Sequence, residues 1–482
     1  MKKRLNLLFI LTDDQGAWAM HCAGNTDLHT PNLDRLAAQG TRFENFFCAS
    51  PVCSPARASI LTGCIPSRHG VHDWIRSGNL DKSQLGEDAN RPDFAEEDRP
   101  ISYLEGLETY PDLLAKQGYT CALSGKWHLG DSLRPQHGFS HWYTIGRGGC
   151  PYYQADMVEN GQLHWENRYI TDLITDRALD YLDEFAGGEN PFYISVHYTA
   201  PHSPWDEKDH PAEYIELYRD CEFTATPDLP LHPNLLPTAP SGTGQRRKEL
   251  LRGYYAAISA MDAGVGRLLD KLEQLGIAQD TLVIFTSDNG MNMGHHGIWG
   301  KGNGTFPFNL FDTAVKVPFL ASWPGHIPAG RVTDSICSHY DIIHTLNDML
   351  ELGGQLPDFL PGRSFAPVLL EGAETDNHVV VLDEYGSSRM IRSREWKYIH
   401  RYPYGPHELY NLSQDPGETR NLAGLPEYAP VQAHLLDQLQ QWYQTYADPA
   451  VDGTREAVSG FGQLRRPGIY SQGLPVYAQG SK

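Results

Sequence analysis

Near its start the chain reads Leu5-Asn6-Leu7-Leu8-Phe9-Ile10-Leu11-Thr12-Asp13-Asp14, an apolar run that ends in two carboxylates. The run has the length of a strand, and its nearly continuous apolar character is typical of a strand buried on both faces. Three later apolar runs also end in polar clusters: residues 119–123 before Ser124-Gly125-Lys126-Trp127-His128, residues 192–198 before Ala200-Pro201-His202, and residues 282–285 before Thr286-Ser287-Asp288-Asn289-Gly290. Because ligands of open α/β sheets bind beyond the carboxyl ends of the strands, we expect the four clusters to meet.

The pattern of strand, loop and helix repeats through about residue 370. It predicts an α/β fold, with a large mixed, mainly parallel sheet sandwiched by helices. One long helix is expected over residues 247–275, since apolar residues recur there at steps of three or four and Gly276 follows as a stop. Residues 77–99 and 226–244 are polar or rich in Pro, Ser and Thr, which indicates surface loops.

The sequence pattern changes at about residue 376. Short strands are expected at residues 379–382, 389–392, 396–401 and 408–412, followed by a helix near 430–446. We therefore divide the chain into a catalytic α/β domain (1–375), a C-terminal subdomain of antiparallel sheet plus helix (376–450) and a tail (451–482). The tail has glycine-bearing turns and no periodicity, so we expect it to cover the surface or to reach a partner subunit in a homo-oligomer.

Composition narrows the class of protein and its partners. The 482 residues are 40% hydrophobic and 21% charged, which excludes disorder and coiled coil. A formal charge of -21 disfavours nucleic acid and anionic membranes, and no apolar run reaches the ~20 residues of a membrane-spanning helix. Met1-Lys2-Lys3-Arg4 imitates a signal peptide, but the apolar run is short and no small-residue cleavage site follows it. Eight irregularly spaced cysteines indicate reduced thiols, and we expect a cytoplasmic protein whose partner is a small molecule or a neutral surface.

Two pairs of oxygen-bearing side chains follow core strands, namely Asp13 with Asp14 and Asp288 with Asn289. Either pair alone is explained as a turn or a helix cap. Together they supply three carboxylates and an amide, hard ligands that suit Ca²⁺ or Mg²⁺. Adjacent carboxylates also repel each other unless a cation neutralises them. The sequence therefore predicts a divalent cation site.

Cys53 begins the segment Cys53-Ser54-Pro55-Ala56-Arg57-Ala58-Ser59-Ile60-Leu61-Thr62-Gly63. Pro55 fits the first turn of a short helix and Gly63 its end, so Cys53 lies at a helix N-terminus, with Arg57 one turn later. Taken from these residues alone, Cys53 is a thiol activated by Arg57 and the helix dipole, and the alternative is an inert buried cysteine.

Cys53-x-Pro55-x-Arg57 followed by Leu61-Thr62-Gly63 resembles the signature of the type I, formylglycine-dependent sulfatases of the alkaline phosphatase superfamily. Further segments are similar to the family's and occur in the same order: Thr12-Asp13-Asp14-Gln15, Gly125-Lys126-Trp127-His128-Leu129-Gly130, Ala200-Pro201-His202, Ser287-Asp288-Asn289-Gly290 and Gly297-Ile298-Trp299-Gly300-Lys301-Gly302. Residues 396–399 and 408–412 resemble its C-terminal subdomain. The resemblance spans about residues 5–425 and implies an alkaline phosphatase-like fold.

The resemblance implies that a maturation enzyme oxidises Cys53 to Cα-formylglycine (3-oxoalanine). One hydroxyl of the hydrated aldehyde attacks sulfur and displaces the alcohol. The other hydroxyl then loses its proton, and the hemiacetal expels sulfate. Asp13, Asp14, Asp288 and Asn289, with the group formed from Cys53, would bind Ca²⁺, or Mg²⁺ in its place.

The resemblance also implies roles for the remaining polar residues. Arg57 would neutralise the developing alkoxide of the hydrate. Lys126, His202 and Lys301 would hold the sulfate oxygens by electrostatic preorganisation. His128 is the candidate base for hemiacetal collapse, and His202 or Lys301 is the candidate acid for the leaving oxygen, since histidine has a pKa near 6.5.

A polar and aromatic cluster at residues 68–76 follows the Cys53 helix. We interpret it as a candidate site for the leaving group, because polar groups beside an aromatic platform are common in sugar sites, and the alternative is a solvated loop. His296 lies at a family position often near substrate, or caps a loop. The candidate substrate residues are Arg68, His69, His72, Asp73, Trp74, Arg76 and His296, with Arg147 and Glu384 as weaker candidates.

The leading hypothesis is a sulfuric ester hydrolase that releases inorganic sulfate from a small organic sulfate, preferably a sulfated mono- or oligosaccharide. An arylsulfatase, or a phosphonate monoester or phosphodiester hydrolase of the same superfamily, is the alternative enzyme. A protein that binds a sulfated glycan without turnover is the alternative of another class. The expected partners are the substrate and a formylglycine-generating maturation enzyme, with no nucleic acid and no membrane.

Overall fold

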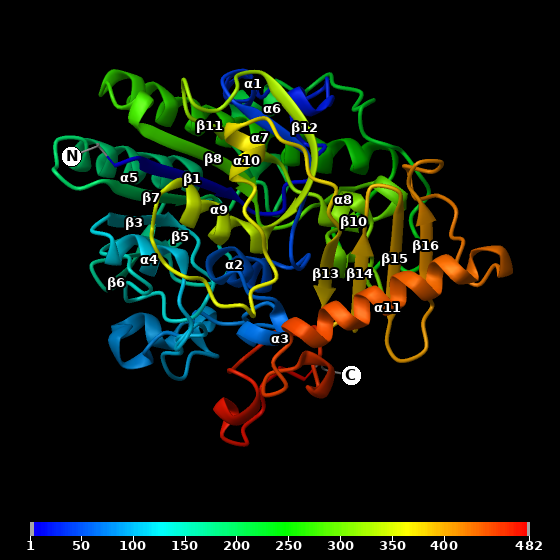
Figure 1. Cartoon of the computed structure of the whole chain (residues 1–482). Helices are drawn as coiled ribbons and strands as arrows, with labels where there is room; N and C mark the ends of the chain where they lie inside the picture. The colour runs from blue at the N-terminus through cyan, green and yellow to red at the C-terminus, as the bar shows by residue number, and fades with distance from the viewer. Residues whose placement is uncertain (1–3, 480–482) are drawn as a thin grey trace.

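A ten-stranded sheet forms the centre of the protein in the computed structural model, which describes residues 4–479 (Figure 1). Residues 1–3, which belong to the signal-like start, and residues 480–482 of the tail lie outside the described residues. The spatial order is β12 (Arg331–Ser338), β2 (Thr41–Phe47), β11 (Phe319–Ser322), β8 (Thr281–Ser287), β1 (Asn6–Thr12), β7 (Phe192–His197), β3 (Thr120–Gly125), β4 (His141–Ile145), β5 (Ala155–Glu159) and β6 (Gln162–Glu166).

The four apolar runs that end in polar clusters form the middle of this sheet as β8, β1, β7 and β3. Adjacent strands of these four pair in parallel. Leu7 of β1 lies opposite Tyr193 of β7 on one side and Leu282 of β8 on the other. Parallel pairing brings their carboxyl ends to one edge, as the sequence predicted. The sheet is mixed because β11, β5 and β6 pair antiparallel with their neighbours.

Helices cover both faces of the sheet, which explains why β1 is apolar at successive positions. Leu7, Phe9 and Leu11 belong to one hydrophobic core, while Leu8 and Ile10 belong to the core on the opposite face. The first core includes α2 (Cys53–Thr62), α4 (Tyr110–Lys116), α9 (Ile342–Met349) and α10 (Ala366–Leu370). The second includes α1 (Pro31–Ala38), α5 (Ile170–Phe185) and α7 (Gly244–Gln274), the long helix expected from the sequence.

A separate four-stranded antiparallel sheet follows the main domain. It consists of β13 (Val379–Asp383), β14 (Ser388–Arg392), β15 (Trp396–Arg401) and β16 (Glu408–Asn411), and α11 (Ala429–Tyr446) lies across it (Figure 1). Leu435, Leu439 and Tyr443 bury one side of α11 against this sheet. The elements agree with the expected subdomain, and the boundaries at 375/376 and 450/451 stay predictions.

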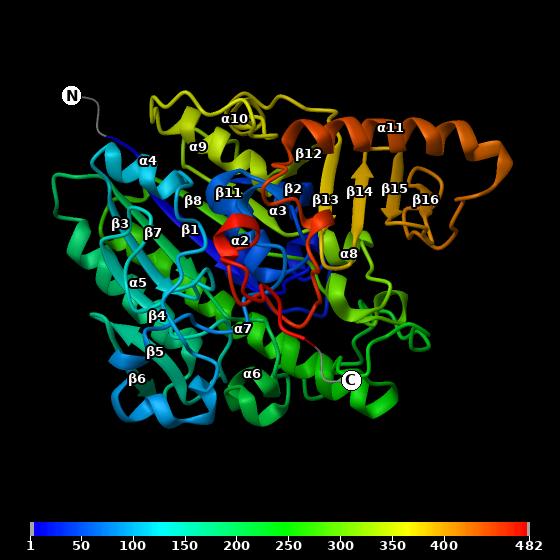
Figure 2. The ribbon, with the colours of Figure 1, turned by 90° about the horizontal axis from the view of Figure 1, so that it is seen from below.

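The tail from residue 451 returns to the main domain beside α3 (Pro66–His69), as Figure 2 shows, and the amide of Gly453 donates to Oγ of Ser67 at 2.9 Å. Gln463 forms a bridge with Ile75 and another with Tyr477, so the tail pairs with the segment after α3 and with itself. Of the two alternatives expected for the tail, the structure contains the first, a cover over the chain's own surface. Among residues 4–479, none of the helices combines the length and apolarity needed to span a bilayer.

Candidate active site

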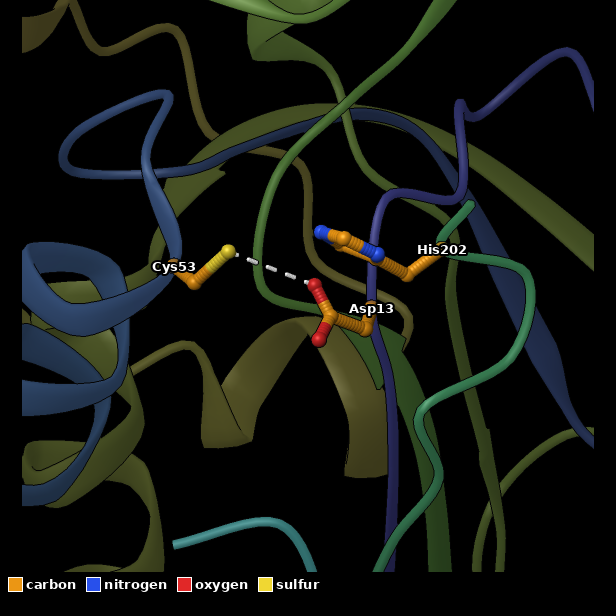
Figure 3. Close-up of side chains that lie close together, drawn as sticks. All are labelled: Asp13, Cys53 and His202. Carbon is orange, nitrogen blue, oxygen red and sulfur yellow. Dashed lines mark hydrogen bonds between the residues drawn. The ribbon is translucent and has the colours of Figure 1, made fainter. Parts of the chain in front are cut away.

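Cys53 is the first residue of α2, and every residue of this helix is buried. The extended Val52 precedes the helix, and Gly63, whose φ of 70° is left-handed, ends it. The Cys53 thiol lies at the carboxyl edge of the main sheet, with Sγ 3.4 Å from Oδ1 of Asp13 (Figure 3) and 2.8 Å from Nζ of Lys301. The predicted helix start is therefore confirmed, and it faces the ends of the central strands.

Three carboxylates converge beside this thiol. Asp13 and Asp14 directly follow β1, and Asp288 directly follows β8; one oxygen of each lies within 4.8 Å of the others. Asp13, Cys53 and the imidazole of His202 form a second such group, and their side chains approach one another in Figure 3. Residues more than 270 positions apart thus meet because their strands are parallel neighbours.

Three cationic side chains balance the three carboxylates. Arg57 donates from Nε to Oδ2 of Asp288 at 2.9 Å, and its Nη2 lies 3.7 Å from Oδ2 of Asp13. Lys126 pairs with Asp13, and Nζ of Lys301 lies 2.6 Å from Oδ1 of Asp14. All six side chains are almost completely buried, so each charge depends on its partners for stabilisation.

The cluster changes the proton affinity of its members in different directions. Burial raises the pKa of Asp13, but Lys126, His202 and other neighbouring cations outweigh it and hold that pKa well below its usual range. Burial and the charge of Asp13 raise the pKa of Asp288 to about 7. The same two causes raise the pKa of the Cys53 thiol to about 12. Arg57 and the helix terminus do not produce the activated thiolate that the residues alone suggested, because burial beside a carboxylate outweighs them.

Asn289 completes an oxygen-rich set that fits a hard divalent cation. Its Nδ2 donates to Oδ1 of Asp14 at 2.8 Å. Its Oδ1 is buried and accepts no hydrogen bond within residues 4–479. An unpaired buried carbonyl oxygen beside three carboxylates is the donor set that Ca²⁺ and Mg²⁺ take in proteins.

His128 adopts a left-handed backbone conformation, with a φ of 59°, just beyond β3. Its Nε2 lies 2.8 Å from the carbonyl oxygen of Ile75. A carbonyl only accepts, so Nε2 carries the proton and Nδ1 holds the lone pair. Nδ1 is buried and has no hydrogen-bond partner among the described residues. Burial, assisted by Lys126, holds the pKa of His128 well below its usual value, so the ring is neutral.

His197 was not identified from the sequence, and its Nδ1 lies 3.5 Å from Nη1 of Arg57. Its Nδ1 donates to the carbonyl oxygen of Lys126 at 2.9 Å, and its Nε2 lies 2.7 Å from Oγ of Ser195. Burial and the charge of Arg57 lower the pKa of His197 to about 3. The available signal was the pair of polar residues at alternate positions at the end of the otherwise apolar β7.

Two cavities open from this cluster. The first, of about 780 Å³, is lined by Cys53, Lys126 and His128, and the second, of about 700 Å³, is lined by Asp14. Both are lined by His202, Lys301, Trp74, Asn303, Gly460 and Phe461. The first also has charged walls at Arg76, Asp93, Glu96, Glu97 and Arg147, whereas the second has aromatic walls at Trp205, Trp299, Phe306, Phe308 and Tyr385. A ligand bound at the cluster can therefore extend into a cavity with charged walls or into a cavity with aromatic walls.

Of the candidate substrate residues, Trp74, Arg76 and Arg147 line these cavities. Several others hold the C-terminal part of the chain. Arg68 donates to the carbonyl oxygen of Tyr446 at 2.6 Å, and His72 contacts the Tyr477 hydroxyl and the Val451 carbonyl at 2.7 and 2.8 Å.

The remaining candidates also lie outside the two cavity linings. Asp73 accepts from backbone amides of the tail, and His69 contacts the Ser59 hydroxyl at 3.0 Å. His296 stacks on Phe311 with ring centroids 3.7 Å apart. Glu384 pairs with Arg389 at 3.3 Å. The structure thus brings together the predicted metal and catalytic residues, and separates the predicted substrate residues.

Arg57→Met is expected to lower the free energy of unfolding by about 3–5 kcal/mol, because it leaves the buried carboxylate of Asp288 without its paired cation, whereas Asp13 keeps Lys126. Urea unfolding followed by circular dichroism measures the change. Arg394→Met is the control, since Arg394 pairs with Asp334 at 2.8 Å on the surface, where such a pair contributes little. Equal effects of both substitutions would contradict the importance assigned to the buried pairs.

Residues 5–352 match the model of the family described as Sulfatase, and residues 294–445 match that of N-sulphoglucosamine sulphohydrolase, C-terminal. The chain belongs to the sulfatase family. This sulfatase is 28% identical to an N-acetylglucosamine-6-O-sulfatase of Bacteroides thetaiotaomicron, over 92% of this chain and 87% of the relative. It is 30% identical to arylsulfatase A of Bos taurus, over 90% and 87% of the two chains. The sulfatase is therefore a sulfuric ester hydrolase.

Solved structures share the fold of the sulfatase. One, a complex of a protein with its substrate D-glucosamine-2-N,6-O-disulfate, superposes with a TM-score of 0.74 at 25% identity and covers 94% of this chain and 100% of that one. The phosphonate monoester hydrolase of Agrobacterium radiobacter shares the fold with a TM-score of 0.68 at 21% identity, over 92% and 96% of the two chains. Membership of the family implies a formylglycine and a divalent metal, and the acidic cluster fits the latter.

Proposed function

We propose that this sulfatase hydrolyses the sulfate ester of a sulfated mono- or oligosaccharide, with Cys53 converted to formylglycine by a maturation enzyme. One observation carries the proposal: Cys53 lies beside three carboxylates, two lysines and His202 where two cavities join. The hydrated formylglycine supplies the attacking hydroxyl and the cation supplies Lewis acidity. Asp13, Asp14, Asp288 and Asn289 would hold that cation, for which we propose Ca²⁺, with Mg²⁺ as the alternative.

Lys126, Lys301 and His202 bind the sulfate oxygens in this proposal. Each ammonium has three N–H donors, so pairing with one carboxylate leaves donors free for sulfate. All three side chains line the cavity that contains Cys53. Because they are fixed before substrate arrives, their charges stabilise the transition state with little reorganisation.

His128 would accept, at its unprotonated Nδ1, the proton released as sulfate leaves the group formed from Cys53. We assign the proton for the leaving alcohol to His202, whose side chain is 36% exposed and lies 3.6 Å from Oδ2 of Asp14. Lys301 is the poorer acid. Burial lowers its pKa, but Asp14 and the other anionic neighbours outweigh burial and raise it well above its usual value. A group that holds its proton so strongly donates it slowly near neutral pH.

The sugar assignment rests on the two cavities and on the relatives. A sugar has hydroxyls for charged and polar walls and C–H faces for aromatic walls, and both kinds of wall meet at the cluster. The Bacteroides relative is an N-acetylglucosamine-6-O-sulfatase, and a human relative of 30% identity, over 78% of this chain and 67% of its own, is an N-acetylgalactosamine-6-sulfatase. We therefore propose a 6-sulfated amino sugar as the first substrate to test.

Parallel assays separate the alternatives. Sulfate release from N-acetylglucosamine-6-sulfate or N-acetylgalactosamine-6-sulfate is expected with a kcat/KM at least about 10-fold above that for nitrophenyl sulfate. A preference for nitrophenyl sulfate supports the arylsulfatase, which the bovine relative favours. A preference for a phenylphosphonate ester supports the phosphonate hydrolase. Saturable glycan binding by fully converted protein without sulfate release supports the binding protein.

Two further parts of the proposal concern the protein in the cell. We propose a cytoplasmic location, which fractionation of the producing cells tests, and association of copies through the tail, which sedimentation at several protein concentrations tests. Deletion of residues 451–482 dissociates the oligomer if the tail forms the interface. An unchanged sedimentation coefficient of the full chain across the concentration range, at the monomer value, counts against association.

A further inference from the structure

A short loop of the tail, residues 459–461, lines both cavities at the site. Ser459, Gly460 and Phe461 line the aromatic cavity, and Gly460 and Phe461 also line the cavity that contains Cys53. The two matches to family models end at residues 352 and 445, so this loop belongs to neither. Neither match therefore assigns a role to this loop.

The loop is fixed in place by the segment that follows α3. Oδ2 of the buried Asp73 accepts from the amides of Gly460 at 3.0 Å and Gly462 at 3.2 Å. Nε1 of Trp74 donates to the carbonyl oxygen of Gly460 at 3.3 Å. A Cβ on Gly460 would lie 2.8 Å from the Tyr385 ring, so the backbone itself packs against that ring. Contacts from two sides make the loop a built wall of the cavity.

Phe461 stands out because it lines two cavities and yet is 52% exposed. The half-buried Trp74 lines the same shared space, together with Asn303. An exposed aromatic ring at the rim of a polar catalytic cluster offers an apolar face to a ligand at little cost in conformational entropy. His202 and Lys301, which are proposed to bind sulfate, also line this space, so the part of the substrate next to the sulfate would adjoin it.

We propose that residues 459–461 are a specificity-determining wall of the substrate site, in which the Phe461 ring packs against the C–H face of the sulfated sugar. This inference rests on the proposed function, since it assumes that a sugar sulfate is the ligand. In this proposal, a segment that lies outside both family-model matches helps to bind the leaving group. It also explains why Asp73 and Trp74 hold the tail at this position.

Phe461→Ala is the direct test, with N-acetylglucosamine-6-sulfate and N-acetylgalactosamine-6-sulfate as probes. We expect KM to rise about 10-fold, the size of one lost aromatic contact, and to change more than kcat does. Phe461→Tyr keeps the ring and is expected to restore KM. Ile469→Ala is the matched control, because Ile469 belongs to the same tail, is 79% exposed and lines neither cavity. An unchanged KM in Phe461→Ala overturns the proposal.

A binding measurement separates failure of the wall from failure of the proposed function. In the Cys53→Ala background, calorimetry gives the Kd of the same sugar sulfates with and without Phe461→Ala. A Kd raised about 10-fold supports the wall even where the parent enzyme releases no sulfate, an outcome that would count against the proposed function alone. An equal Kd, or no binding by the Cys53→Ala protein, overturns the wall even where sulfate release is normal.

Discussion

Cys53→Ala is expected to reduce sulfate release by at least about 10⁴-fold, because alanine has no thiol for a maturation enzyme to oxidise, so the formylglycine nucleophile cannot form. The fold should survive, since the pairs between Lys126 and Asp13 and between Lys301 and Asp14 do not involve the sulfur. Initial rates on the best sugar sulfate measure the loss. Circular dichroism and the thermal midpoint check that the variant is folded.

Cys221→Ala is the matched control, because Cys221 is a partly buried cysteine that lines neither of the two cavities. It should leave sulfate release unchanged. Residual turnover above a few percent in Cys53→Ala, with Cys221→Ala normal, would point to another nucleophile.

The same protein allows a chemical test of Cys53 itself. After co-expression with a maturation enzyme, the mass of the peptide containing Cys53 should match an aldehyde or its hydrate. The high pKa of the thiol makes this conversion important, because a thiol with a pKa of about 12 is hardly ionised at neutral pH. A fully retained thiol, with normal maturation of a control sulfatase in the same cells, favours the non-catalytic binding protein.

Removal of divalent cations is the second large effect. Chelation is expected to lower sulfate release by at least about 100-fold, and added Ca²⁺ should restore it. Because three carboxylates and the unpaired Asn289 oxygen form the site, a cation should also stabilise the fold, by about 2.7 kcal/mol at 100 times its Kd. The thermal midpoint with and without Ca²⁺ or Mg²⁺ measures this stabilisation independently of activity.

Asn289→Ala should weaken the thermal shift produced by Ca²⁺, since it removes a neutral ligand and leaves all charges in place. Asn45→Ala is the control, because Asn45 is a half-buried asparagine of β2 that lines neither cavity and whose Nδ2 donates to the Asp334 carbonyl. Full activity of metal-stripped protein, or equal thermal shifts in both variants, would falsify the metal assignment.

Much of the fold and of the catalytic cluster is readable from local sequence. The apolar run at residues 5–11 and the three runs like it became neighbouring parallel strands, because only a strand covered on both faces needs such continuous apolar character. Once those strands are parallel, the clusters at their ends must share one edge. The positions of Asp13, Lys126, His202 and Asp288 at that edge follow from this rule and from the resemblance.

The residues that bind the leaving group could not be predicted from local sequence in the same way. Arg68, His72 and Asp73 have the composition of a sugar site, but they bind the end of α11 and the tail, 378 to 405 positions later in the chain. Their partners are backbone amides, carbonyls and one hydroxyl, groups that leave no local pattern in a sequence. Phe461 likewise lines the cavities only because those contacts hold its loop there, so the sequence alone did not identify it as a candidate.

The amino-acid sequence by itself determined which residues end the core strands, where the Cys53 helix begins and which side chains have the chemistry to hold a cation. The tertiary structure alone decided how their charges combine. Three carboxylates and three cations share one buried volume, and burial there raises the pKa of the Cys53 thiol and lowers that of His128. It also decided the position of the tail. Both results depend on desolvation and on distances between residues far apart in the chain, and neither quantity is encoded in local periodicity.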